Sequence, residues 1–485
     1  MRGVVAAGNV HTAAAASRIL REGGNAVDAA IAAALTCFSA EPLLTSAGGA
    51  GIMLVSKPGE DPVAVDFFSP FPGAGGRPKR LDFQAIEVDF GSAKQAFHVG
   101  RAAAAVPLVL DGLAVAAEQF GQLELAQLVA PGVELARDGV IIDVITARTF
   151  ELLWPILRRD PDCLAEIAEG LPDDRPPQVG QRLRNSGLAA TLERYATLGR
   201  TPPGLRDGLL AEFGPARGGM ISAEDLDAAQ VVVKTPHCFQ IGEWKVASSP
   251  RLGGRLVGMI SEELSLASLA SCEVAELLRI ARASRSGHQA RTGLPPDSRG
   301  STTHISVVDE HGAAASVTLT AGEGCGHVVR GTGVHINNFL GEEDLNPIGF
   351  HLHRPGDALP TMIAPTIAIH PDGRVLALGS GGSNRIRSAV SQVLHAILRR
   401  GASLEQAVAA PRVHGEDQGA WVELGDRAAP AAILEALARE FPAVHAFEGR
   451  DFFFGGVHVA ARNAQAQLAG VGDARRGGAV AITDA

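Results

Sequence analysis

The chain has no excess of basic residues. Its 485 residues include 43 Lys and Arg against 53 Asp and Glu, which gives a formal net charge of −10 at pH 7. Binding to nucleic acid needs clustered basic side chains that neutralise phosphates. The composition therefore argues against a nucleic-acid partner and favours an acidic enzyme.

Cysteine is also scarce. The five cysteines are odd in number and widely scattered, and none shows C-x-x-C or Cys/His ligand spacing. We expect reduced thiols in a cytoplasmic protein, with no metal and no cofactor. The cysteines are Cys37, Cys163, Cys238, Cys272 and Cys325.

Long apolar runs are missing as well. The N-terminus has one basic residue but no long apolar stretch followed by a cleavage site, so export is not expected. The most apolar helical stretch, Ala26 to Ala40, contains Asp28 and falls short of the roughly 20 residues of a bilayer span. No membrane segment is expected.

Apolar residues nevertheless make up 46% of the chain, enough to bury a large core. Their spacing predicts an α-rich first part and a hairpin-rich last part. We expect helices at 26–40, twice within 105–139 and within 257–283, and strands at 52–55, 62–68, 231–234 and 244–248. We expect later hairpins at 305–308 with 313–320 and at 366–369 with 375–378, then a helix that ends at Gly401.

The tract around Thr302 is the strongest candidate for catalysis. Residues 291–300 are rich in Gly and Pro, whereas Ile305, Val307 and Val308 begin a β-branched strand. A threonine at such a junction gains a free α-amine if the preceding bond is cut, and that amine, with a pKa of about 7.7 to 8.0, can activate its own hydroxyl. The alternative is an ordinary strand threonine.

Thr320 lies near Thr302 in the expected hairpin. A four-residue turn places Thr302 opposite Leu319, and a longer turn or a bulge places it opposite Thr320. A hydroxyl there could orient the nucleophile. A cross-strand threonine pair with a purely structural role is equally consistent with the pattern.

Two further segments could contribute to a site. Gly379 to Ser383 precedes a helix whose unsatisfied N–H groups could stabilise an oxyanion. A phosphate cradle is the alternative, but the Gly-Lys-Ser/Thr ending is missing, and a plain turn also fits. The second segment, Asn337 to Pro347, gathers carboxylates that could anchor an ammonium group or form a solvated acidic loop.

Taken together, these residues resemble the γ-glutamyltransferase family of N-terminal-nucleophile hydrolases. Residues 22–30, Glu41-Pro42 and Gly48 to Gly51 are similar to its N-terminal signature, and 302–309 matches its processing site. The resemblance covers nearly the whole chain, and several ordered motifs are more specific than any one of them.

This resemblance implies an α+β fold, a four-layer αββα sandwich. It also implies cleavage between Ser301 and Thr302, giving a heterodimer of residues 1–301 and 302–485 that forms one composite fold and could associate further as a homo-oligomer. Among the residues, it implies Thr302 as nucleophile, Thr320 as supporting hydroxyl, Gly381 and Gly382 in the oxyanion loop, Glu342 as anchor for a substrate α-amino group, and Thr361 and Ser383 at substrate-binding positions.

The departures from the family pattern concern substrate recognition. The family's Asp-Phe-Arg-Glu tract, whose arginine clamps the glutamyl carboxylate, reads Asp66-Phe67-Phe68-Ser69 here. Arg101 is a candidate to replace that cation. In addition, Pro360-Thr361 stands where the family has a serine pair, and Ala321-Gly322 replaces an expected asparagine.

We therefore expect a self-processing, γ-glutamyltransferase-like amidohydrolase or acyltransferase that acts on a small amide or peptide-like substrate and recognises glutamyl groups poorly. One alternative is an acylase or a natural-product biosynthetic enzyme of the same fold. The other is a non-catalytic scaffold that never matures.

Overall fold

The computed structural model describes residues 1–89, 94–266, 269, 272–290, 301–425 and 427–483. The breaker-rich run predicted at 291–300 lies outside the described residues. Ser301 and Thr302, which form the predicted cleavage site, are both described.

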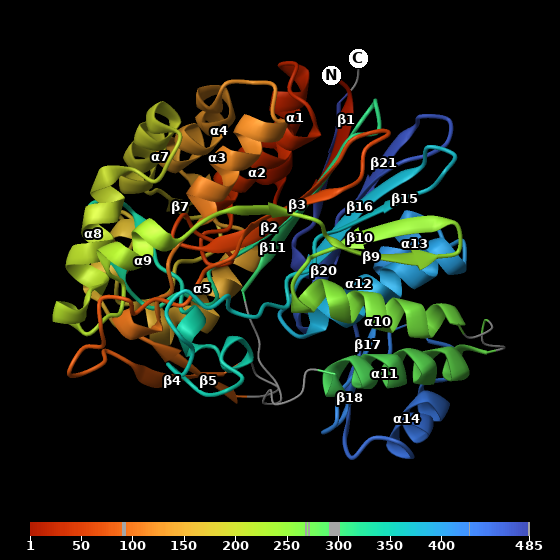
Figure 1. The fold of residues 1–485 in the computed structure, drawn as a ribbon. Helices are drawn as coiled ribbons and strands as arrows, with labels where there is room; N and C mark the ends of the chain where they lie inside the picture. Colours follow the sequence, from red (N-terminus) through yellow and green to blue (C-terminus); the bar gives the residue numbers. More distant parts are fainter. Residues whose placement is uncertain (90–93, 267–268, 270–271, 291–300, 426, 484–485) are drawn as a thin grey trace.

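Two β-sheets form the centre of the molecule and stack face to face (Figure 1). The first sheet runs in the order β22 (Ala479–Ile482), β1 (Gly3–Ala7), β11 (Thr303–Asp309), β12 (Ala314–Thr320), β2 (Ala50–Ser56), β3 (Val63–Phe67) and β8 (Val232–Lys234). The second runs in the order β21 (Leu468–Val471), β20 (Gly456–Arg462), β16 (Val375–Gly381), β15 (Thr366–Ile369), β10 (Trp244–Ser248) and β9 (His237–Ile241). Buried side chains from both sheets, including Leu54, Val308 and Ala377, fill the space between them.

Helices cover the outer face of each sheet, which completes the expected four layers (Figure 1). α1 (Val10–Arg21) and α2 (Ala26–Ala40) pack on the first sheet. α10 (Leu252–Leu266), α11 (Glu273–Gln289) and α12 (Arg385–Leu394) lie on the side of the second. The predicted αββα architecture is confirmed.

The remaining elements surround this sandwich. The helices are α3 (Val109–Phe120), α4 (Leu125–Asp138), α5 (Val144–Leu157), α6 (Pro161–Ile167), α7 (Ser186–Leu198), α8 (Pro203–Phe213), α9 (Ala223–Ala228), α13 (Leu404–Ala409) and α14 (Pro430–Ala438). The strands are β4 (Gln84–Asp89), β5 (Lys94–Val99), β6 (Val140–Ile141), β7 (Arg182–Leu183), β13 (Val328–Val329), β14 (Val334–His335), β17 (Val413–Gly415), β18 (Ala420–Glu423) and β19 (Val444–Phe447).

Helix α2 shows why the sequence folds as it does near the site. The Asn25 side chain accepts the N–H groups of Val27 and Asp28 at 2.8 and 3.0 Å, and the Asp28 carboxylate accepts the Asn25 N–H at 2.9 Å. This reciprocal cap fixes the first turn. All residues of α2 are buried, so the helix crosses the core between sheet and outer helices.

The hairpin β11–β12 fixes the position of Thr302. Thr303 pairs with Leu319, so one further step in the register brings Thr302 opposite Thr320. The four-residue turn, which would put Thr302 opposite Leu319, is wrong, and the longer turn is right. The longer turn is stabilised by Asp309, whose carboxylate accepts hydrogen bonds from the N–H groups of His311 and Ala313.

The same register extends across two more strands. Leu319 pairs with Gly51, which pairs with Phe67, and Thr320 pairs with Ala50. The next row runs from Thr302 through Thr320 to Ala50, and Phe68, the residue directly after β3, lies at its far end. Both Ala50 and Phe68 belong to one apolar core cluster. With neighbouring strands about 4.8 Å apart, Phe68 lies about 14 Å from Thr302 along this row.

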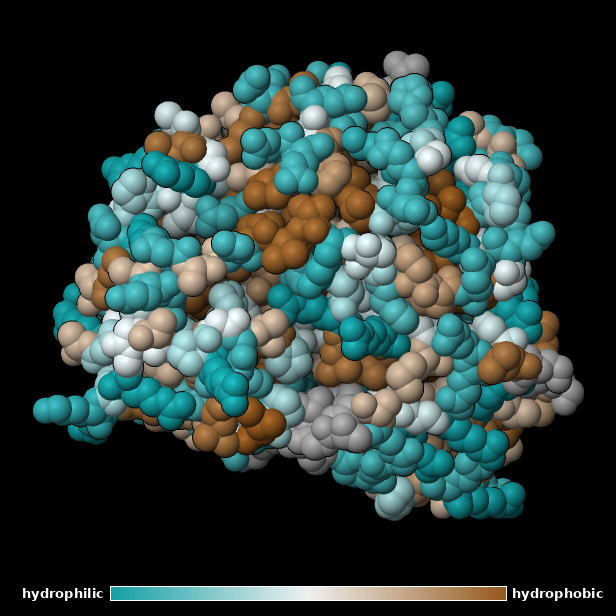
Figure 2. Space-filling model, in the orientation of Figure 1, coloured by the Kyte–Doolittle hydropathy of each residue, from teal (hydrophilic) through white to brown (hydrophobic). Residues whose placement is uncertain are grey.

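The face seen in Figure 2 is largely hydrophilic, with apolar residues gathered near its middle around β3 and β8. β8 is an edge strand, and Val232 and Val233 on it are 46% and 38% exposed. Within the described parts of the chain, no helix has both the length and the apolar character needed to cross a bilayer.

Candidate active site

The peptide bond between Ser301 and Thr302 is held at the head of β11. The Thr320 hydroxyl donates a hydrogen bond to the Ser301 carbonyl oxygen at 2.6 Å, and the Gly322 N–H donates to the Thr320 oxygen at 3.0 Å. At the N-terminal side of Ser301, its backbone N–H donates a hydrogen bond to the Glu323 carboxyl group at 3.2 Å. Thr302 itself is only 4% exposed. The carbonyl that a self-cleaving threonine would attack is thus already polarised by a hydroxyl.

The residue after Thr302 is anchored by a buried carboxyl. Thr303 donates to Glu41 at 2.6 Å, and Thr12 donates to the other Glu41 oxygen at 2.9 Å. Burial raises the pKa of Glu41, and the two hydroxyl contacts oppose that shift. Glu41 therefore links the start of β11 to α1 and α2. From the sequence, Glu41 is identified only as part of the N-terminal signature, with no partner.

The glycine segment lies against Thr302. A side chain at Gly381 would come within 2.1 Å of the Thr302 carbonyl oxygen, and Gly382 has φ of 120°, so both positions require glycine. The expected loop from Gly379 to Ser383 is shorter than predicted because β16 continues to Gly381. Gly379 belongs to this strand, where its missing side chain admits the His304 ring.

Helix α12 begins directly after this loop, so its first N–H groups favour negative charge nearby. The buried guanidinium of Arg476 adds a cation, since its Nη1 would lie 3.3 Å from a Cβ at Gly381. Burial lowers the pKa of Arg476 to about 9, with Arg385 adding to the effect, so the group stays positive at pH 7. No sequence motif points to this residue.

Three buried carboxyl groups, Glu323, Glu342 and Asp344, face this region. Burial raises the pKa of Glu323 to about 8. Burial, and then the neighbouring Glu323 and Asp344, raise the pKa of Glu342 well above its usual range. The solvated acidic loop considered from sequence is therefore wrong for Glu342 and Asp344, whereas Glu343 between them is exposed. Such a group can take on charge when a substrate ammonium arrives beside it.

The replacement of the family's asparagine by Ala321-Gly322 has a visible cause. A Cβ at Gly322 would lie 2.1 Å from Asn338 Oδ1 and 2.3 Å from Glu342 Oε1. Asn338 reaches this space from the acidic segment and accepts the Glu323 N–H at 2.9 Å. An amide is thus present, but it comes from another part of the chain.

At the far end of the row, Phe68 stacks on Phe339 with ring centroids 5.0 Å apart. Arg251 lies beside it, 5.5 Å from the ring centroid. This guanidinium is already engaged, because it donates to Asp66 at 2.8 Å and to the Leu359 carbonyl at 2.8 Å. The cation next to the missing clamp is therefore bound to the protein's own groups.

Arg101, the candidate substitute for the clamp, is paired with carboxylates of the protein itself. Its Nη1 lies 3.1 Å from Asp82, and its Nη2 lies 3.8 Å from Asp160. His327 joins the same network, 3.3 Å from Arg101 Nη1. The guanidinium Nη atoms of Arg101 are thus paired with side chains from both sides of Thr302, namely Asp82, Asp160 and His327.

The structure separates the two remaining substrate-binding candidates. Ser383 lies by the acidic segment, and its hydroxyl donates to Asp344 at 3.3 Å. Thr361 is buried near the start of α10, where its carbonyl accepts the Gly253 N–H at 2.8 Å and its hydroxyl accepts the Ile363 N–H at 3.3 Å. These contacts connect Thr361 to α10 and not to Thr302.

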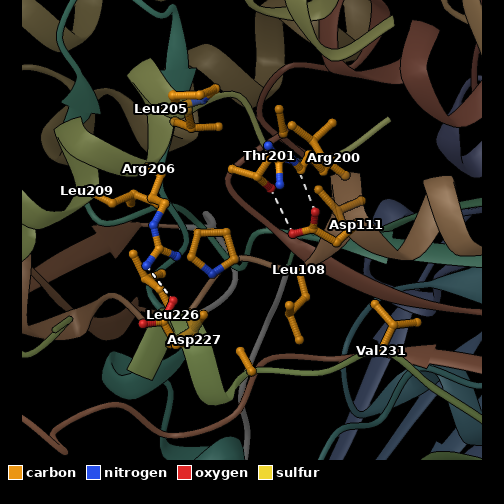
Figure 3. Close-up of a pocket in the computed structure, with 17 residues that line it drawn as sticks. Leu108, Asp111, Arg200, Thr201, Leu205, Arg206, Leu209, Leu226, Asp227 and Val231 are labelled. Atoms are coloured by element: carbon orange, nitrogen blue, oxygen red, sulfur yellow. Dashed lines mark hydrogen bonds and ion pairs between the residues drawn. The ribbon is translucent and has the colours of Figure 1, made fainter. Parts of the chain in front are cut away.

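A separate cavity of about 510 Å³ lies among α3, α8 and α9 (Figure 3). Thr201 bonds to Asp111 on one wall, and Arg206 pairs with Asp227 on another, as Figure 3 shows. Ala47 also lines this cavity, and Gly49, two residues later, lies next to the Thr320 carbonyl. Thr302 does not line this cavity, so we do not assign it to the acyl group.

Comparisons with known proteins agree with this geometry. The model of the gamma-glutamyltranspeptidase family matches residues 12–270 and 265–483. The Acylase ACY 1 proenzyme of Pseudomonas sp. (strain SE83) is 28% identical, covering 90% of this chain and 86% of that protein. The glutathione hydrolase proenzyme of Escherichia coli (strain K12) is 27% identical, covering 82% and 78%.

Among solved structures, cephalosporin acylase from Bacillus halodurans superposes with a TM-score of 0.80 at 22% identity, covering all of this chain and 96% of that one. At this identity the likeness supports the fold. The family match over nearly the whole chain goes further: this protein belongs to the gamma-glutamyltranspeptidase family of N-terminal-nucleophile enzymes.

Proposed function

We propose that the chain cuts itself between Ser301 and Thr302 and then uses Thr302 to hydrolyse or transfer the acyl group of a small amide that need not carry a glutamyl α-carboxylate. The hydrogen bond from the Thr320 hydroxyl to the Ser301 carbonyl, 2.6 Å long, carries the proposal. It places a donor where negative charge develops when that carbonyl is attacked.

Self-cleavage follows from this arrangement. The Thr302 hydroxyl oxygen bonds to the Ser301 carbonyl carbon, and Thr320 stabilises the oxyanion. The carbon–nitrogen bond then breaks, the hydroxyl proton ends on the departing nitrogen, and an ester links the two residues. Water cleaves the ester, which leaves a carboxylate on Ser301 and a free amine and hydroxyl on Thr302.

In the mature enzyme the same threonine serves turnover. Its amine takes the hydroxyl proton, and the oxygen attacks the substrate carbonyl. The Gly381-Gly382 segment, the start of α12 and the charge of Arg476 favour the oxyanion. The amine then protonates the leaving nitrogen, and water or an acceptor amine releases the acyl group.

The substrate proposal depends on the two ends of the acyl site. Glu342 offers a carboxyl to an ammonium group, as the family resemblance implies. Phe68 offers an apolar surface where a carboxylate clamp is expected, and Arg251 is held by Asp66. This favours the acylase alternative over glutathione hydrolysis, and relatives of both names are found at similar identity.

Mass spectrometry of the purified protein tests the first step. We expect two fragments, 1–301 and 302–485, that remain associated in size-exclusion chromatography. A single intact chain after prolonged incubation would contradict self-cleavage and support the scaffold alternative. Thr302→Ala is the control, because any cleavage that persists in it comes from another protease.

A further inference from the structure

Glu323 makes a contact that neither the family resemblance nor the comparisons assign. It lies 2% exposed in the turn after β12, and it accepts the N–H of Ser301 at 3.2 Å. Its own backbone N–H donates to Asn338 Oδ1 at 2.9 Å, so the acidic segment fixes its place. Ser301, which supplies the carbonyl of the bond to be cut, is therefore held by a carboxyl group.

We infer that Glu323 is a positioning residue for self-cleavage, holding Ser301 so that its carbonyl faces both Thr302 and Thr320. This inference rests on the proposed function. Thr320 fixes the C=O of Ser301 and Glu323 fixes its N–H, so the two contacts together restrict rotation about both backbone bonds of that residue. Holding an attacked group in the reactive geometry is a major source of rate acceleration.

The charge on Glu323 matters as well as its position. The groups that face it are the carboxyls of Glu342 and Asp344, the amide of Asn338 and the Ser301 N–H. Burial favours its neutral form up to a pH of about 8, since its pKa is raised to about 8. An ionised Glu323 would bring negative charge next to the oxyanion forming on Ser301, so the neutral form suits the reaction better.

Three variants of the full chain separate these effects. Glu323→Gln keeps an acceptor for the Ser301 N–H but cannot ionise. Glu323→Ala removes the acceptor. Glu343→Gln removes one charge from the exposed residue between Glu342 and Asp344, and it serves as the matched control. Each chain is made in a cell-free translation system, and the intact and cut forms are followed by gel electrophoresis between pH 6 and 9.

We expect Glu323→Ala to cut at least 10-fold more slowly than wild type at every pH. Below pH 7, Glu323→Gln should cut itself at a rate within 3-fold of wild type. Above pH 8 its rate should rise relative to that of wild type, so that the ratio of the two rates changes with pH. Glu343→Gln should follow wild type throughout. A purely structural role would leave the ratio for Glu323→Gln independent of pH.

Wild-type rates in Glu323→Ala, or a flat ratio for Glu323→Gln, would overturn the inference. If Glu323→Ala is cut as fast as wild type while Thr302→Ala stays intact, self-cleavage by Thr302 is supported and only the role of Glu323 is refuted. If wild type itself is never cut, the proposed function falls first. Thermal melting monitored by circular dichroism checks that slow variants are folded, and a folded Glu323→Ala that cuts slowly supports the inference.

Discussion

The two ends of one row of the first sheet differ in chemistry. At the Thr302 end, Thr320 and Glu323 hold the Ser301 peptide group, and Gly381 approaches it from the second sheet. At the other end, Phe68 stacks on Phe339, and the neighbouring Arg251 is bound to Asp66. In the proposed mechanism, bond cleavage depends on residues at the ends of β11 and β12, whereas substrate choice depends on Phe68 after β3, so one could change while the other persists.

The largest effect we expect is at the catalytic end. Thr302→Ala removes the nucleophilic hydroxyl, so self-cleavage should stop and the α-amine that acts as base is never released. Turnover should fall by on the order of 10⁴ or more. Intact mass spectrometry and an amide-hydrolysis assay measure the two losses. Thr303→Ser, which keeps a hydroxyl for Glu41, is the neighbouring control and should still be cut.

Thr320→Val should slow self-cleavage by about 10²- to 10³-fold, because it removes the donor to the Ser301 carbonyl while nearly keeping the side-chain shape. Thr320→Ser keeps the hydroxyl, so its rate of self-cleavage should fall far less. The half-time of cleavage in cell-free synthesis measures both. Equal rates for the valine and serine variants would show that this hydroxyl does not stabilise the oxyanion.

The recognition end is probed by a matched substrate pair, γ-glutamyl anilide and 4-aminobutanoyl anilide, which differ only in the α-carboxylate. A charge-assisted clamp is worth about 1.5–3 kcal/mol, which is roughly 10- to 150-fold in kcat/KM. We expect no such preference for the glutamyl compound here. Phe68→Arg should raise the relative kcat/KM for γ-glutamyl anilide about 10-fold, and strong wild-type preference for it would refute the proposed loss of the clamp.

Glu342 can be tested with butanoyl anilide as the partner of 4-aminobutanoyl anilide. If its carboxyl receives the ammonium group, Glu342→Gln should lower the preference for the amino compound by roughly 10-fold. Glu343→Gln, which alters the exposed neighbour, should leave it unchanged. The ratio of kcat/KM values for the two anilides is the measurement.

The smallest effect concerns stability. Because burial raises the pKa of Glu41, the folded chain keeps this proton at pH values where the unfolded chain has released it. Its contribution to stability is therefore full below the ordinary glutamate pKa of about 4.3 and declines as the pH rises through the folded value. Glu41→Gln cannot ionise, so its melting temperature relative to wild type should rise by roughly a few degrees between pH 4 and 8. A difference that stays constant with pH would show that Glu41 keeps an ordinary pKa.

The main elements of the fold could be predicted from sequence because local signals agree with the final structure. The Asn25 cap, the alternation in β11 and β12 and the glycines before α12 each specify their element. The exact register could not be predicted, since it depends on how the Asp309 side chain closes the turn. A shift of one residue decides whether Leu319 or Thr320 faces Thr302.

The proximity of Thr302, Thr320, Gly381 and Glu342 could be inferred because ordered motifs carry them. Glu323 could not, because it lies at no recognised spacing and acts only through a contact to Ser301. Arg476 was missed for a similar reason, as it approaches Gly381 from a distant part of the chain. The pairing of Arg101 could not be predicted either, because its partners, Asp82 and Asp160, come from separate segments of the chain.

Both sheets contain strands from each side of the Ser301–Thr302 bond, and β1 lies between β11 and β22 (Figure 1). Before a cut, such a chain refolds as a single molecule whatever its concentration. After a cut, the same native structure can be regained only when two separate pieces meet, so recovery from denaturation becomes dependent on dilution. The one broken bond would thus turn a reversible folding reaction into an assembly that, once lost at low concentration, is regained slowly or not at all.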